Sequence, residues 1–317
     1  MQSILKEWHP DSQSTYRRCI EHDEENWKIE NTQFIKDPQD YAMLRALIVK
    51  HFGTLKDVFL HIASKDEFPT IEMFGTEEFS KHMGLIDGKH VKKKDINRMF
   101  IAANVSDKDN EHSNPVNALV RYEFIEFLVR MAKYKYKEAG LVATTAESFE
   151  RLMNELVTPY FELHCQDWQP FRDKYLLNTM IDNLMYVNKK GLENIFIKLA
   201  TQNKNKAFNI ANCFQVMRQL NLNLADTAVT YAFGMSHQTV VNESKNYTAY
   251  DRLIFVEFVE FLCRILYFKF SSDYESNQLK DFKTGAGQAK DLSEAIENSF
   301  PNSQHNSSRK TKPKDEE

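Results

Sequence analysis

The sequence predicts an all-α protein built from two copies of one helical unit. The stretch RYEFIEFLVRMAKYKY at 121–136 returns in similar form as FVEFVEFLCRILYFKF at 255–270. Such an internal repeat is typical of a duplicated structural unit. Glycine and proline number only 9 and 8 in 317 residues, which disfavours sheet-rich folds because these need many turns. Between the turns, apolar residues recur at the spacing of amphipathic helices.

Length, charge and hydropathy argue against a nucleic-acid-binding, membrane-spanning or secreted protein. A chain of 317 residues has room for two domains. The formal net charge of −4 gives no support for nucleic-acid binding. No apolar stretch approaches a membrane span of roughly 20 residues, and the first residues lack the apolar run of a signal peptide. We therefore expect no nucleic-acid partner, no membrane contact, and a location in the cytoplasm or in a structure open to it.

The four cysteines suit a reducing compartment. They lie far apart in the sequence, and none has the spacing of a metal site. They are Cys19, Cys165, Cys213 and Cys263.

Residues 1–30 are expected to form an N-terminal arm, made of short helical pieces that dock on the body of the protein. The acidic run at 21–26 is expected to be a turn or loop. The docking residues are expected to be Trp8, Tyr16, Cys19, Ile20 and Trp27.

The first unit is expected at 31–140. Its apolar pattern predicts a helix at 40–52, a break at Gly53 and a second helix at 55–63. The remaining elements are expected as helices at 74–86, 93–104 and 121–136, with a long polar loop at 105–118.

A linker helix is expected within 141–165. It begins at Thr144 or Thr145, with Glu147 placed for a capping box, and Pro159 is expected to end it.

The last region, 273–317, is polar, lacks helical periodicity at its end, and is expected to be disordered. The second unit is expected at 166–272. The second unit's helices are predicted at 175–191, 192–200, 210–222, 224–235 and 255–270, with a polar loop at 236–250.

The order helix, loop, helix occurs twice in each unit, and the chain thereby resembles the EF-hand superfamily as a tandem of two degenerate EF-hand pairs. The resemblance covers about 31–136 and 168–270. It implies short strand-like pairing between the two loops of each unit, through an apolar residue at loop position 8. The residues that carry it are Ile71, Leu119, Glu123, Phe124, Phe208, Leu253, Glu257 and Phe258.

The ligand positions of these loops are largely lost. The first loop, 64–75, has Ser64, Asp66, Phe68, Glu72 and Gly75 at positions 1, 3, 5, 9 and 12. The third loop, 201–212, has Thr201, Asn203, Asn205, Asn209 and Asn212 there, without any carboxylate. In the fourth loop, Asn246, Thr248 and Tyr250 take the places of the first three ligands. We therefore expect no tight calcium site.

The second loop is the best candidate if any loop holds a metal ion, and calcium is then the only candidate cofactor. It is lengthened, it is rich in acidic residues, and Glu123 keeps position 12. Glu123 and its counterpart Glu257 have two open explanations, which are helix capping and inheritance of a motif whose metal was lost. The candidate ligands are Asp107, Asp109, Glu111 and Glu123.

No pattern points to an enzyme. Nucleotide-binding, metalloprotease and nucleophile-elbow motifs are missing from the sequence. Cys165 follows His164, but sequence neighbours rarely form a catalytic pair. The Glu123 and Glu126 pair recurs as Glu257 and Glu260, which favours a structural role.

More narrowly, residues 121–136 and 167–196 are similar to EF-hand-type proteins of ciliary axonemes, which include microtubule inner proteins. This similarity implies a non-enzymatic structural protein of the cytoskeleton. Its partners would be tubulin in the microtubule doublet and neighbouring axonemal proteins, bound without calcium. The alternative hypothesis is a calcium-responsive regulatory subunit of an enzyme complex, which needs at least one working loop.

Overall fold

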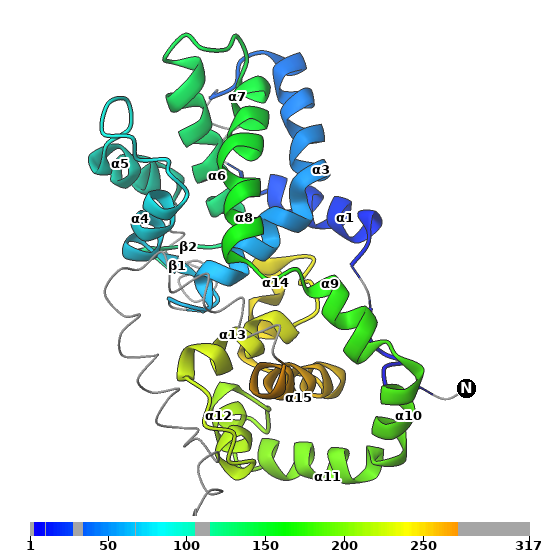
Figure 1. The fold of residues 1–317 in the computed structure, drawn as a ribbon. Coiled ribbons are helices and arrows are strands. Elements are labelled where there is room, and N and C mark those ends of the chain that lie inside the picture. Colours follow the sequence, from blue (N-terminus) through cyan, green and yellow to red (C-terminus); the bar gives the residue numbers. More distant parts are fainter. Residues whose placement is uncertain (1–2, 10, 28–33, 67, 105–114, 272–317) are drawn as a thin grey trace, which may run out of the picture.

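The protein is mostly helical, as the sequence predicts. The computed structural model describes residues 3–9, 11–27, 34–66, 68–104 and 115–271 (Figure 1). The polar tail predicted at 273–317, and the acidic residues predicted in the second loop at 107–111, lie outside these ranges.

The first repeat, as we call residues 38–137, runs from a long helix to the first copy of the repeated stretch. Asp37 caps the long helix by accepting a hydrogen bond from the N–H of Gln39 at 2.9 Å, and Pro38 follows at the first helical position. Its elements are α3 (Pro38–Ala63), β1 (Ile71–Glu72), α4 (Met73–His82), α5 (Lys93–Ala103), β2 (Ala118–Leu119), α6 (Arg121–Ala132) and the π-helical turn η1 (Lys133–Lys137).

The break predicted at Gly53 is wrong, because α3 passes through it without interruption. A single glycine weakens a helix but does not end it when the flanking residues are buried. A Cβ atom at this position would lie 3.2 Å from the hydroxyl oxygen of Tyr16. Gly53 thus allows the N-terminal helix α1 (Gln13–Glu24) to pack closely against α3.

Two helices joined by a π-helical turn connect the repeats: α7 (Thr145–Leu152), η2 (Met153–Val157) and α8 (Thr158–His164). The predicted capping box is confirmed, since Thr144 accepts from the N–H of Glu147 at 3.1 Å and Glu147 accepts from the N–H of Thr144 at 3.0 Å. The end predicted at Pro159 is wrong. Pro159 lies in the first turn of α8, directly after the wide π turn, where its missing N–H and its ring are tolerated.

The second repeat, residues 168–270, departs from the expected pattern in two places. Asn178 and Asn188 interrupt the helix predicted at 175–191, so Gly191 lies inside a helix. The loop predicted at 236–250 contains short helical turns. The elements are α9 (Trp168–Phe171), η3 (Arg172–Leu176), α10 (Thr179–Val187), α11 (Lys189–Ala200), α12 (Ile210–Gln219), α13 (Asp226–Ser236), α14 (Glu243–Asn246), η4 (Tyr247–Asp251) and α15 (Phe255–Phe270).

The predicted pairing of loops is present in both repeats. Ile71 pairs with Leu119 in an antiparallel two-stranded sheet formed by β1 and β2. Phe208 pairs with Leu253 through an antiparallel bridge, in which the N–H of Leu253 donates to the carbonyl of Phe208 at 2.8 Å. All four side chains are buried. The apolar residue at each predicted position 8 therefore lies in the core between two loops.

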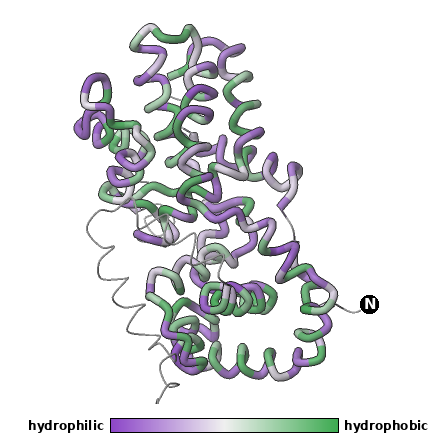
Figure 2. Tube along the Cα trace, in the orientation of Figure 1, coloured by the Kyte–Doolittle hydropathy of each residue, from purple (hydrophilic) through white to green (hydrophobic). Residues whose placement is uncertain are grey.

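The repeated helices α6 and α15 lie at the centre of the core. Figure 2 shows α15 as largely hydrophobic where the other helices surround it. The predicted core positions on both helices are buried, and the buried apolar side chains of the arm, the linker and the two repeats form one continuous cluster. These core positions are Phe124, Phe127, Leu128 and Met131 on α6, and Phe258, Phe261, Leu262 and Ile265 on α15.

The N-terminal arm docks on the body, as predicted, with Cys19, Ile20 and Trp27 fully buried. The prediction of an acidic loop at 21–26 is wrong in part, because α1 continues to Glu24 and the side chain of Asp23 points into the interior. Within the described ranges, no helix combines the length and the apolar character needed to cross a membrane.

Candidate functional site

The first predicted loop, 64–75, keeps acidic residues at two ligand positions, Asp66 and Glu72, and the carboxylate of Asp66 is used internally. Asp66 accepts a hydrogen bond from the N–H of Glu72 at 2.7 Å. At position 12, a Cβ atom on Gly75 would lie only 2.3 Å from a carboxylate oxygen of Asp66. Asp66 therefore fills the space that a larger residue at position 12 would need, and a bidentate glutamate does not fit there without a shift.

Phe68, at position 5 of the same loop, contacts the second repeat instead of a metal ion. Its ring centroid lies 5.7 Å from that of Phe233 and 5.8 Å from that of Tyr250. A Cβ atom on Gly234 would come within 2.7 Å of the Phe68 ring. Glycine in α13 therefore makes room for an aromatic side chain that joins the two repeats.

In the third predicted loop, 201–212, a side-chain amide lies between two groups at expected ligand positions. The Nδ2 of Asn203 donates to the carbonyl of Ala207, at position 7, at 2.6 Å, and to the Oδ1 of Asn212, at position 12, at 2.7 Å. Lys206 keeps the left-handed backbone, φ 52°, that glycine usually supplies at position 6. The loop keeps its shape through neutral hydrogen bonds.

The second loop shows a related contact. Asn104 follows α5, and its Nδ2 donates to the carbonyl of Ala118, at position 7, at 2.8 Å. The candidate ligands Asp107, Asp109 and Glu111 lie outside the described residues. Among the residues described, no group of three or more histidine, cysteine, aspartate or glutamate side chains is arranged to hold a metal ion.

Glu123 and Glu257 cap their helices, as one of the two explanations predicted. Glu123 accepts from the N–H of Val120 at 3.2 Å, and Glu257 accepts from the N–H of Ile254 at 2.8 Å. Glu257 also accepts from the N–H of Gln238 at 2.8 Å, which ties the preceding loop to α15. Burial raises the pKa of Glu257 to about 7. The hydrogen bonds from the two backbone N–H groups lower this pKa, but burial has the larger effect.

The second glutamate of each repeated stretch forms a buried ion pair one helical turn away. Glu126 pairs with Arg130 at 2.6 Å, and Glu260 pairs with Arg264. Glu260 also accepts from Arg172 at 3.1 Å and from the indole N–H of Trp8 at 2.9 Å. The arm, η3 and α15 thus meet at one carboxylate.

A second buried ionic cluster joins the arm to both repeats. The guanidinium of Arg121, at the start of α6, pairs with Asp23 of α1 at 2.9 Å and with Glu243 of α14 at 3.1 Å. It also donates to the carbonyl of Val240 at 2.8 Å, and the hydroxyl of Tyr250 donates to Glu243. Burial raises the pKa of Asp23 and of Glu243, while Arg121 opposes that rise in both. No pattern in the sequence indicated this cluster.

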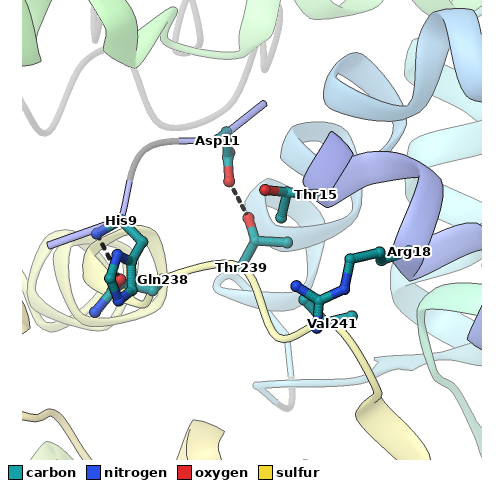
Figure 3. Close-up of a pocket in the computed structure, with 7 residues that line it drawn as sticks. All are labelled: His9, Asp11, Thr15, Arg18, Gln238, Thr239 and Val241. Carbon is teal, nitrogen blue, oxygen red and sulfur yellow. Dashed lines mark hydrogen bonds between the residues drawn. The ribbon is translucent and has the colours of Figure 1, made fainter. Parts of the chain in front are cut away.

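The arm also borders a pocket of about 460 Å³ next to the second repeat (Figure 3). At its wall, Asp11 pairs with Lys56 of α3 at 2.5 Å and accepts from the hydroxyl of Thr239 at 2.5 Å. The N–H of His9 donates to the Oε1 of Gln238 at 2.8 Å. The hydrogen bonds from His9 to Gln238 and from Thr239 to Asp11 brace the arm against the second repeat. The lining residues are His9, Asp11, Thr15, Arg18, Gln238, Thr239 and Val241.

Comparisons with known proteins give no relative for this chain. No family model matches it, and neither the curated proteins nor the solved structures contain a match. The geometry described above therefore carries only the calcium-independent part of the functional argument.

Proposed function

We propose that this chain is a non-enzymatic structural protein of the ciliary axoneme. It binds microtubule doublets or neighbouring axonemal proteins through a tandem of EF-hand-like pairs that do not use calcium. The choice of the axoneme rests on the sequence similarity of residues 121–136 and 167–196 to EF-hand-type axonemal proteins.

The observation that carries the calcium-independent part of the proposal is the position of the Asn203 amide. Its two hydrogen bonds, to Ala207 and Asn212, join groups that a bound cation would otherwise bridge. A cation would have to displace a hydrogen-bond donor and would meet no carboxylate in this loop. The loop is therefore stable in its paired form without metal.

The contacts between repeats support a fixed rather than a switching conformation. Calcium sensors work by opening helix pairs and exposing a groove. Here Phe68 of the first repeat packs against α13, and Arg121 binds carboxylates from the arm and from the second repeat. A change in the angle between helices would break these buried contacts, so a rigid scaffold fits better than a sensor.

Two measurements test the proposal. A tagged full-length chain is expected along the axonemes of ciliated cells and to remain with them after detergent extraction, whereas a diffuse distribution would contradict the axonemal role. Calorimetry with calcium is expected to give no saturable heat. A saturable micromolar signal would favour the alternative, a calcium-responsive regulatory subunit, and would direct attention to the second loop.

A further inference from the structure

The loop between α4 and α5, with the first turns of α5, carries a local excess of positive charge. Residues 87–98 contain five lysine or arginine side chains and two aspartates, a net charge of +3, in a chain whose formal net charge is −4. Both α4 and α5 lie at the edge of the molecule (Figure 1), and Figure 2 shows the loop that joins them as hydrophilic.

Both aspartates of this segment are engaged within it or with its neighbours. Asp87 accepts hydrogen bonds from the N–H groups of Lys89, His90 and Val91 at 3.0, 2.7 and 2.9 Å. Its other oxygen pairs with Lys135 of η1 at 2.8 Å. Asp95 accepts from the N–H of Lys92 at 3.0 Å. These carboxylates hold the backbone in shape. Of the outward lysines, Lys93 pairs with Glu77 of α4 at 2.8 Å.

The loop presents its lysines from a fixed backbone. Val91 is fully buried and anchors it, and Gly88 supplies the left-handed turn, with φ 71°. Lys89, Lys92 and Lys94 are exposed, and none of them has an ion-pair partner in the part of the chain that the structure describes. Binding a partner through these three side chains therefore needs little further ordering of the backbone that carries them.

We propose that this basic surface, formed by Lys89, Lys92 and Lys94, binds an acidic polypeptide segment. This proposal rests on the proposed structural function. It adds that the partner bound by this surface is an acidic polypeptide segment. A negative chain as a whole repels long polyanions such as nucleic acid or an anionic membrane, whereas a short acidic segment meets only the local surface. Residues 85–98 also contain no phenylalanine, tyrosine or tryptophan on which bases could stack.

The test is a titration of the full-length chain with a fluorescent decaglutamate peptide, read by anisotropy. Saturable binding that weakens as salt rises from about 50 to about 300 mM is expected. The variant K89E/K92E/K94E is expected to bind at least about tenfold more weakly, because three attractive contacts become repulsive. A matched control, K190E/K198E/K204E, changes the charge equally at three exposed lysines of the second repeat and should bind as the unaltered chain does.

Three results would overturn the inference: no saturable peptide binding, equal weakening by both triple variants, or tighter binding of a single-stranded RNA or of phosphatidylserine vesicles than of the peptide. Circular dichroism of both variants shows whether the fold is kept. Association with axonemal doublets is measured separately. If the unaltered chain and K89E/K92E/K94E associate equally well, the basic surface is not the contact, while the structural role stands.

Discussion

Arg121 and Asp23 form a doubly hydrogen-bonded ion pair in the interior, with the Nε of Arg121 donating at 3.1 Å and an Nη at 2.9 Å. Arg121 comes from the first repeat and Asp23 from the arm, and the same guanidinium reaches Glu243 of the second repeat. Three segments that are distant in sequence are therefore joined at one cation, which is 1% exposed.

Replacing Arg121 by methionine is expected to lower the free energy of unfolding by about 3–5 kcal/mol, because two buried carboxylates lose their counter-ion. Urea denaturation measures the loss. The matched control is R151M, since Arg151 and Glu155 form a half-exposed pair and should contribute less than about 1 kcal/mol. The variant D23N/R121M/E243Q should recover part of the loss, and equal stability of R121M and R151M would contradict the assignment.

Phe68→Ala should cost about 2–3 kcal/mol, since the aromatic contacts with Phe233 and Tyr250 are lost and a void forms against Gly234. Phe74, which is 68% exposed, supplies the control of the same residue type. Thermal or urea unfolding of F74A is expected to match the unaltered chain. If F68A unfolds no more easily than F74A, Phe68 does not join the repeats.

Asn203→Asp places a carboxylate oxygen against the carbonyl of Ala207 and the Oδ1 of Asn212, where an amide now donates. A loss of about 1–3 kcal/mol is expected in EDTA. Asn205→Asp is the matched control, because Asn205 only accepts a hydrogen bond, from the N–H of Ala207, and aspartate keeps that acceptor. Denaturation curves that coincide for the two variants would show that the amide does not hold the loop.

Glu257 should give stability a pH dependence. Burial raises its pKa from 4.5 to about 7, so the folded chain keeps a proton that the unfolded chain releases across this range. The free energy of unfolding should therefore fall as pH rises from about 4.5 to about 7, by at most about 3 kcal/mol. Glu257→Gln removes this dependence, and Glu162→Gln, an exposed control, keeps it.

His237 should give the free energy of unfolding the opposite pH dependence over an overlapping pH range. Burial lowers its pKa to about 4, so stability due to the neutral imidazole is lost as pH falls from 6.5 to about 4. The difference between E257Q and the unaltered chain isolates the glutamate. Identical pH profiles for the two proteins would contradict the raised pKa of Glu257.

Local patterns in the sequence predicted most helices, because these depend on apolar spacing and on capping residues near in sequence. The loop pairings followed from the helix–loop–helix resemblance, which places an apolar residue at position 8 of each loop. The positions of Ile71, Leu119, Phe208 and Leu253 are examples. The breaks expected at Gly53 and Pro159 were wrong because tertiary contacts and a π turn outweigh intrinsic helix preference.

The ionic contacts between segments could not be predicted in the same way. Nothing near Asp23 in the sequence indicates that its partner is Arg121, and the run at 21–26 has the composition of an exposed loop. Similarly, Phe68 stands at a lost ligand position, and nothing in the sequence around it indicates that its ring contacts α13. Such pairings are set by the packing of whole helices.

We propose above that this chain has a structural role that does not use calcium. Its most direct test is co-sedimentation of the full-length chain with salt-washed ciliary doublet microtubules, in EGTA and in calcium. Saturable binding of equal strength is expected in both conditions. A chain that stays in the supernatant, or that sediments only when calcium is present, would contradict it.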